Sequence, residues 1–202
     1  MPPTLPLLAD HDVHAWVIGL GDADKGRRRE LAHLARDRLL AGYLGVRPGS
    51  LEFVRGPGGK PRLRDEALRF NLSHSDRLGL VGVSRARELG VDVQAPHPAT
   101  CKPWFARRIC TPREYSAYAG QPDGLLRLWV RKEAVVKARG DGSFLALDGI
   151  DVSDEAVVGG WLCRDLELPG APPGYRAALA VSTVPGDGVA ATTAISICAF
   201  SW

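Results

Sequence analysis

The sequence lacks any unbroken run of eighteen apolar residues, the minimum length for a transmembrane helix. Its opening residues, MPPTLPLLADHD, lack the basic segment and the following apolar segment of a secretory signal. No C-x-x-C pair occurs among Cys101, Cys110, Cys163 and Cys198, which argues against a zinc knuckle or a thioredoxin-like motif. We therefore expect a cytoplasmic protein with no membrane partner, whose cysteines are reduced thiols.

The net charge is small, but positive charge is locally concentrated. The 202 residues are 45% hydrophobic and 24% charged, which is ordinary for a soluble globular protein of one large or two small domains. The net charge is only +3, yet residues 25–38, KGRRRELAHLARDR, contain six lysines and arginines. Such a cluster suits a phosphorylated cofactor, an acidic protein or a nucleic acid. Nucleic acid ranks last, because the chain lacks the interleaved aromatic residues of a nucleic-acid module.

Hydrophobic periodicity predicts the elements of the first part of the chain. Residues 13–20 alternate as a strand, and 23–46 repeat apolar residues at helical spacing, with an end expected near Gly45. The stretch GPGGKP, residues 56–61, is too rich in glycine and proline for regular structure. Three short apolar runs then predict an antiparallel meander, over 67–74, 78–84 and 89–94.

The composition shifts at APHPATCKP, residues 95–103, which we interpret as a link between two parts, 1–95 and 96–202. TPRE predicts a helix start, with Thr111 as the N-cap and Glu114 closing a capping box. A second helix is expected from Asp123 to about Ala138, followed by strands near 148–153, 157–164, 175–182 and 190–199. Each part then holds helices and a short antiparallel sheet, so the predicted class is α+β.

Three short stretches contain residue types that bind metals or phosphates. In LGVDVQ, strand alternation puts Asp92 and Gln94 on one face, a plausible half-site for a hard cation, although an edge strand with one solvated face has the same pattern. In FNLSHSD, Ser73 and His74 are able to donate to a phosphate, although these residues also favour turns. No G-x-S-x-G elbow supports a serine hydrolase.

The glycine-rich turn ends in Lys60, but Pro61 follows it, so the turn is not a P-loop and a simple surface turn is the alternative. In WVRKEAVVKARGDG, Glu133 and Lys137 lie four residues apart on one face of a predicted helix. Taken alone, such a pair is usually a solvated ion pair that contributes roughly 0.2–0.5 kcal/mol.

The order of these stretches carries more information than any one of them. GGKP, FNLSHS, GVDVQ and WVRKEAVVK followed by GDG resemble, in this order, the motifs of the 4′-phosphopantetheinyl transferases, and more narrowly the larger, monomeric surfactin-synthetase type. The resemblance spans residues 59 to about 145. It implies two similar α+β halves with the active site between them. It also implies transfer of the phosphopantetheine arm of coenzyme A to a serine of an acyl or peptidyl carrier protein, with release of 3′,5′-ADP.

The resemblance assigns the metal and catalytic residues. It implies that Asp92 and Glu133 hold Mg2+ or Mn2+, with Glu133 as a metal ligand, the base or both, and that Lys137 reaches a coenzyme A phosphate. Many members carry glutamate where this chain has Gln94, whose amide oxygen is a neutral ligand and not a base. We therefore expect Gln94 to bind the ion weakly or through water.

The resemblance also assigns the coenzyme-binding residues. Ser73 and His74 match contacts to the 3′-phosphate, Lys60 matches a lysine near the adenine and the 3′-phosphate, and Lys132 matches a lysine beside the substrate. Arg28 and Arg36 are our candidates for further phosphate contacts, within a run where the choice is open by one position.

Two other functions compete with the transferase. An inactive module that binds coenzyme A or a carrier protein would keep the phosphate-binding residues without a complete metal site, and Gln94 supports it. A basic nucleic-acid-binding protein would rest on residues 25–38 alone. The short, trimeric holo-carrier-protein synthase type is disfavoured, because this chain carries both halves.

Overall fold

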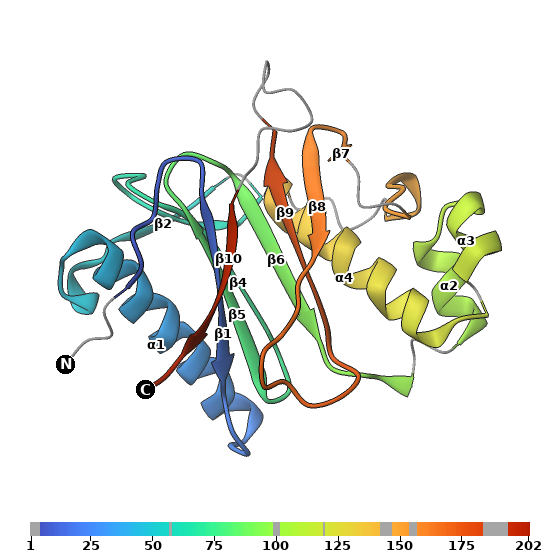
Figure 1. The fold of residues 1–202 in the computed structure, drawn as a ribbon, viewed down its shortest axis with the longest axis horizontal. Coiled ribbons are helices and arrows are strands. Elements are labelled where there is room, and N and C mark those ends of the chain that lie inside the picture. Colours follow the sequence, from blue (N-terminus) through green and yellow to red (C-terminus); the bar gives the residue numbers. More distant parts are fainter. Residues whose placement is uncertain are drawn as a thin grey trace.

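The computed structural model describes residues 5–56, 58–98, 102–118, 120–141, 147–153, 157–183 and 194–202. Within them the class is α+β, as predicted, with two four-stranded sheets of order β10-β1-β5-β4 and β6-β9-β8-β7 and a β2–β3 pair (Figure 1). The strands are β1 (Val13–Gly19), β2 (Phe53–Arg55), β3 (Pro61–Leu63), β4 (Arg69–Ser75), β5 (Leu78–Ser84), β6 (Leu89–Gln94), β7 (Val157–Val158), β8 (Trp161–Asp165), β9 (Arg176–Ser182) and β10 (Ile195–Phe200). The helices are α1 (Lys25–Leu44), α2 (Pro103–Ile109), α3 (Pro112–Tyr118) and α4 (Pro122–Arg139), with short 3-10 turns at Pro48–Ser50 and Leu147–Gly149.

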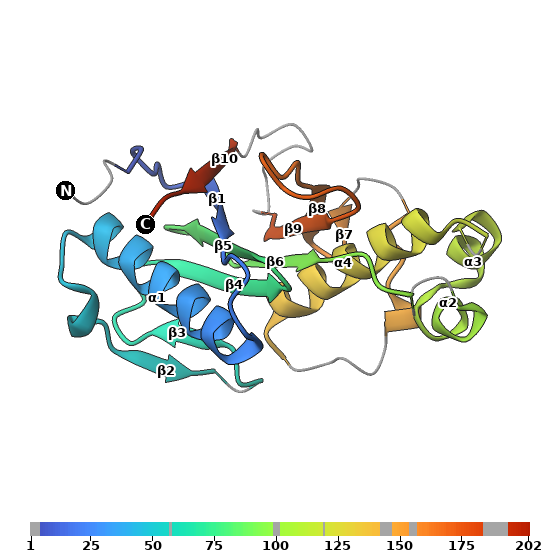
Figure 2. The same ribbon diagram turned by 90° about the horizontal axis from the view of Figure 1, so that it is seen from below.

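The first sheet is centred on β1, which pairs in parallel with β10 and antiparallel with β5. Because side chains alternate along a strand, Trp16 and Ile18 enter a core with α1, whereas Val13 and Val17 face a core shared with β6 and β9. This sheet is therefore covered on both faces, by α1 and by the second sheet. Figure 2 shows α1 at one end of the molecule and α2 and α3 at the other.

Helix α1 begins and ends where its capping residues predict. Asp24 is the N-cap and accepts a hydrogen bond from the backbone nitrogen of Arg27 at 3.0 Å. Gly45 ends the helix in the left-handed region, with φ of 68°. Ala35 and Leu39 are buried against the first sheet, which leaves the basic residues on the rest of the helix surface.

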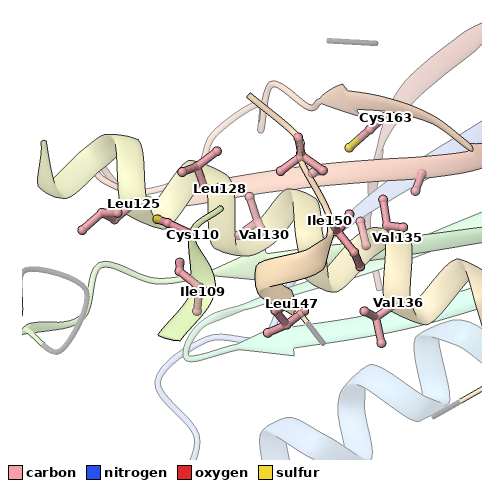
Figure 3. Close-up of a cluster of buried hydrophobic side chains, with 14 of the residues drawn as sticks. Ile109, Cys110, Leu125, Leu128, Val130, Val135, Val136, Leu147, Ile150 and Cys163 are labelled. Carbon is pink, nitrogen blue, oxygen red and sulfur yellow. The ribbon is translucent and has the colours of Figure 1, made fainter. Parts of the chain in front are cut away.

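Helix α4 is the long helix of the second layer. It packs its apolar side chains against β8 and β9 and against α2, in the cluster drawn in Figure 3. Leu125, Leu128 and Val135 are each at most 1% exposed. Gly140 caps the helix with φ of 66°, close to the end expected near Ala138. The capping box before α3 is also present: Thr111 and Glu114 exchange hydrogen bonds of 2.8 and 3.2 Å.

Some predicted strands were wrong. The meander is limited to the β4–β5 hairpin, because β1 occupies the other edge of β5 and β6 joins β9 in the second sheet. Residues 148–153 form no strand, since a 3-10 turn and irregular backbone place Ile150 and Val152 in the core. The strand expected over 157–164 is divided into β7 and β8 by Gly159 and Gly160, both with positive φ.

Strand pairing crosses the predicted division of the chain. Strand β6, which precedes residue 95, pairs with β9, and β10 pairs with β1. These pairings do not test the division into 1–95 and 96–202 or the pseudo-symmetry of two halves, and both stay predictions. Cys101, Gly142 of the GDG motif and the start of the strand expected over 190–199 lie outside the described residues.

Candidate active site

The candidate site is centred on Asp92, whose side chain is fully buried on β6. One carboxylate oxygen, Oδ1, accepts hydrogen bonds from Ser73 Oγ at 2.8 Å and from Lys137 Nζ at 2.5 Å. The other, Oδ2, accepts from Gln94 Nε2 at 3.1 Å. A buried carboxylate is stabilised by such donors, because burial alone would disfavour its charge.

The surrounding strands hold Asp92 in place. Strand β6 passes close to α4 at Gly90, where a Cβ atom would lie 2.2 Å from the carbonyl oxygen of Ala134. On its other side, side chains of β4 accept from backbone N–H groups of β6 and of the residue after it: Asn71 from Val91 at 2.9 Å, Ser73 from Val93 at 3.3 Å and Ser75 from Ala95 at 3.0 Å. Alternate residues of FNLSHS thus replace a backbone ladder between the two sheets.

Glu133 lies beside Asp92 and is only 7% exposed. Burial, and then the negative charge of Asp92, raise the pKa of Glu133 to about 7, while Lys137 opposes the rise. Among the described residues, no hydrogen bond to the Glu133 carboxylate is found. Two adjacent carboxylates, of which only Asp92 is paired with the ammonium of Lys137, form an oxygen-rich, under-neutralised site. This donor set fits a hard divalent cation.

A pocket of about 430 Å³ adjoins this centre and is strongly basic. Helix α1 contributes Lys25, Arg29, His33 and Arg36, which recur at intervals of three or four residues and so share one helix face. The β4 residues Ser73 and His74 line the same pocket, as do Gln94 and Lys137. The pocket therefore lies where the two sheets meet and carries the charge expected of a phosphate-binding site.

The surroundings of the two histidines in the pocket lower their pKa values. The pKa of His74 is lowered by burial and then by the positive charges of Arg29 and Lys137. The pKa of His33 is lowered by burial and then by Arg36 and Arg29. An anion bound among these cations would oppose both shifts, so phosphate binding should be accompanied by proton uptake.

The structure selects among the arginines of residues 25–38. Arg36, a candidate from the sequence, lines the pocket, and its guanidinium lies 4.4 Å from the ring centre of Phe53. Arg28, the other candidate, instead pairs with Asp76. Sequence reasoning missed Lys25, Arg29 and His33, although counting back along the helix from Arg36 by three or four residues finds all three.

Two lysines assigned to the coenzyme or substrate are buried in hydrogen-bonding networks. Lys132 and Glu114 are both fully buried, with Nζ and Oε2 2.7 Å apart, and Lys132 also donates to the carbonyl of Leu147 at 2.8 Å. Lys60 is 8% exposed and donates to Glu88 and to two backbone carbonyls. Their roles toward the coenzyme stay predictions.

Further features of the described residues bear on the site. Within the described part of the chain, no group of three or more histidine, cysteine, aspartate or glutamate side chains is arranged to hold a metal, so a metal here depends on the pair Asp92 and Glu133. A second cavity, of about 590 Å³, lies at the start of α4 and is lined by Arg127, Asp165 and Arg176 but by no predicted site residue. No helix in the described part of the chain is both long and apolar enough to span a membrane.

Comparison with known proteins identifies the class. The family profile described as the 4′-phosphopantetheinyl transferase superfamily matches residues 88–180, which include Asp92, Glu133 and Lys137. The 4′-phosphopantetheinyl transferase HetI of Nostoc sp. is 34% identical over 175 residues, covering 70% of this chain and 73% of HetI. The chain therefore belongs to the 4′-phosphopantetheinyl transferase superfamily, and it is an enzyme of that class.

Two further relatives are also named as 4′-phosphopantetheinyl transferases. The 4′-phosphopantetheinyl transferase AcpT of Escherichia coli K12 is 37% identical over 129 residues, covering 60% of this chain and 64% of AcpT. The 4′-phosphopantetheinyl transferase Sfp of Bacillus subtilis is 31% identical over 100 residues, covering 46% of this chain and 43% of Sfp. The family predicted from the ordered motifs is thus confirmed.

Proposed function

We propose that the protein transfers the phosphopantetheine arm of coenzyme A to a serine of an acyl or peptidyl carrier protein, with a divalent cation held by Asp92 and Glu133. The main support is that Asp92, Glu133 and Lys137 meet at the edge of a basic pocket lined by Ser73 and His74. The carrier's serine oxygen forms a bond to the β-phosphorus, the bond from that phosphorus to the bridging oxygen breaks, and 3′,5′-ADP leaves.

The basic pocket suits the phosphorylated end of coenzyme A. Lys25, Arg29 and Arg36 supply charge along α1, while Ser73 and His74 supply donors from β4. Phosphoryl transfer depends on charge neutralisation and alignment more than on covalent chemistry. Lys137 is half-buried and reaches both the pocket and Asp92, so its ammonium is placed to donate to a phosphate next to the reacting phosphorus.

Glu133 suits a second task, that of a base. In the metal-free site, the Glu133 carboxylate with its pKa of about 7 is a stronger proton acceptor than an ordinary glutamate, and a bound cation would lower this basicity. When bound by Asp92 and Glu133, Mg2+ or Mn2+ supplies charge neutralisation for the pyrophosphate. Glu133 is therefore both a metal ligand and the best-placed acceptor for the proton.

Gln94 is best described as a positioning residue in this proposal. Its Nε2 atom donates to Asp92, and its Oε1 atom accepts from Ser75 Oγ at 3.4 Å. The amide nitrogen, not the oxygen, therefore faces the carboxylate that would hold the ion. We expect Gln94 to orient Asp92 and to meet the ion at most through water.

The carrier protein requires a docking surface, and our candidate lies on α2, at the end of the molecule opposite α1 (Figure 2). Helix α2 exposes a basic–aromatic patch, consisting of Lys102, Trp104, Arg107 and Arg108, in which Trp104 is 57% exposed. An indole among three cations complements an acidic partner. We assign this patch to the carrier, and we expect a monomeric, cytoplasmic enzyme of the larger surfactin-synthetase type that serves polyketide, non-ribosomal peptide or siderophore synthesis.

Intact-mass spectrometry of an apo carrier protein tests this function. Incubation with the protein, coenzyme A and Mg2+ should add the mass of one phosphopantetheine arm, and a chelator should prevent the gain. Glu133→Gln should abolish transfer and retain coenzyme A binding, whereas Glu30→Gln, which alters an exposed carboxylate on α1, should transfer normally. No mass gain on several apo carriers, with coenzyme A still bound, would instead support the inactive binding module.

A further inference from the structure

The amine of Lys60 is fully engaged by the protein. Its Nζ atom donates to Glu88 Oε2 at 2.9 Å, to the carbonyl of Leu89 at 2.8 Å and to the carbonyl of Ala138 at 3.2 Å. An ammonium group has three hydrogens to donate, so these three acceptors use all of them. A phosphate would have to displace at least one buried partner to reach this amine.

Two of the three acceptors belong to the elements that carry the reacting groups, and the third, Glu88, immediately precedes β6. Ala138 lies in the last turn of α4, one residue after Lys137, and Leu89 opens β6, three residues before Asp92. A cation at a helix C-terminus also interacts favourably with the helix dipole. Lys60 thus connects the end of α4 directly to the start of β6.

The glycine-rich turn brings Lys60 to this position through close backbone packing. A Cβ atom at Gly58 would lie 2.1 Å from the carbonyl oxygen of Gly140, and one at Gly140 would lie 2.8 Å from Cδ of Lys60. Only glycine allows the turn and the helix end to approach so closely. The sequences GGK and GDG, which are far apart in the chain, therefore meet at Gly58 and Gly140.

Charges around Glu88 complete the arrangement. Arg69 Nε lies 3.2 Å and Arg62 NH2 lies 3.4 Å from Glu88 Oε1, on the side opposite Lys60. The carboxylate is thereby fixed between strands β3 and β4 and the start of β6. Pro61 lines the basic pocket, but Lys60 is not among the residues that line it in the described part of the chain.

We propose that Lys60 is a positioning residue, which fixes α4 relative to β6 and so places Glu133 and Lys137 beside Asp92, and that its ammonium does not contact coenzyme A. This proposal rests on the proposed transferase function. It departs from the role that the family resemblance implies for Lys60, which is contact with the adenine and the 3′-phosphate.

The first experiment compares coenzyme A with 3′-dephospho-coenzyme A by calorimetry on Lys60→Met, Arg29→Met and the unchanged protein. Arg29→Met should reduce the preference for the 3′-phosphate by about tenfold or more, because a charged pocket residue is lost. Lys60→Met should retain that preference within about twofold. Loss of the preference in Lys60→Met, as in Arg29→Met, would overturn the proposal.

The second experiment separates positioning from a merely structural role. At a temperature where the variant is fully folded, Lys60→Met should lower kcat and weaken Mn2+ binding, each by about tenfold, with little change in KM for coenzyme A. Electron paramagnetic resonance measures the Mn2+ binding without turnover. Unchanged kcat and Mn2+ affinity in a folded Lys60→Met protein would contradict the proposal.

A second variant keeps the test decisive if Lys60→Met does not fold. Glu88→Gln removes the charge of one acceptor and leaves both carbonyl contacts, so it should lower kcat and Mn2+ affinity in the same direction but less. If Glu88→Gln left both kcat and Mn2+ affinity unchanged, the proposal would be overturned. If the unchanged protein itself shows no preference for the 3′-phosphate, the pocket assignment of the proposed function fails instead.

Discussion

Arg28 and Arg29 are adjacent in the chain, but successive residues of a helix point about 100° apart. Arg29 therefore faces the basic pocket, while Arg28 reaches Asp76 on the turn after β4. The run RRR does not distinguish them by composition. Helical periodicity distinguishes Arg29 from Arg28, because Arg36 lies about two turns after Arg29 on the same face.

This adjacent pair gives a matched test of the pocket. Arg29→Met should weaken binding of 3′,5′-ADP by about tenfold or more, because it removes a charged donor from the pocket. Arg28→Met should change the affinity by less than about threefold, because its guanidinium is paired outside the pocket. Calorimetry at fixed ionic strength measures both. Equal losses in the two variants would show that the charge of the whole helix, and not the pocket, binds the ligand.

The raised pKa of Glu133 makes a prediction about stability. In the unfolded chain this carboxyl titrates near 4.5 and in the folded protein near 7, so between these values the native state binds more protons. Its contribution to stability is therefore present below about pH 4.5 and is lost as the pH rises through about 7. Above that pH, the metal-free fold bears the cost of a buried charge beside Asp92.

Glu133→Gln should accordingly stabilise the metal-free protein at pH 8, by up to about 3 kcal/mol, since each pKa unit corresponds to about 1.4 kcal/mol. The gain should shrink toward pH 5, where the native glutamate is largely protonated. Urea unfolding with chelator present at both pH values measures it. A variant no more stable than the parent at pH 8 would contradict a raised pKa of Glu133.

At the scale of elements, the helix ends were predictable and the strand partners were not. Asp24, Thr111 and the glycines 45 and 140 act within one turn of their own positions, so local sequence determines these ends. The pairing of β6 with β9 joins residues about eighty-five positions apart, and hydrophobic periodicity contains no information on such partners.

The candidate site shows the same division between local and distant information. The ordered motifs predicted Asp92, Ser73, His74, Glu133 and Lys137, and the structure brings them together. The sequence could not show that Lys60 and Lys132 are buried, because burial depends on segments distant in sequence, such as α3 and the region after α4.

The buried pair of Lys132 and Glu114 connects α4 to α3 and to the segment after α4. Glu114 also accepts from the backbone nitrogens of Thr111 and Val152, each at 2.8 Å. Lys132→Met should destabilise the fold by roughly 3–5 kcal/mol, because it leaves a buried carboxylate without its cation. Adding Glu114→Gln should recover part of this loss, since the uncompensated charge is gone. Urea unfolding of both variants measures the difference, and equal stabilities would show that the charge pair is not what holds these elements.

At the scale of the molecule, the sheets meet face to face, and the basic pocket lies at their junction. The first sheet owes part of its closure to β10, which pairs along β1 from Val13 with Ile195 to Ile18 with Phe200. The final fifty residues, which the ordered motifs do not reach, thus supply strands to both sheets (Figure 1). These residues therefore contribute to the stability of the whole fold but include none of the predicted site residues.

Phe200 and Trp202 test this separation. Phe200 is 8% exposed in the core with α1, whereas Trp202 is 54% exposed although its indole donates to the carbonyl of Gly19 at 3.2 Å. Phe200→Ala should cost about 3–5 kcal/mol in urea unfolding, and Trp202→Ala about 1 kcal/mol or less. Coenzyme A affinity of the folded fraction should be unchanged in both, because neither ring lines the basic pocket. A loss of affinity in Phe200→Ala at low temperature would instead mean that the closure of the first sheet governs the shape of the pocket, through α1 and its row of basic residues.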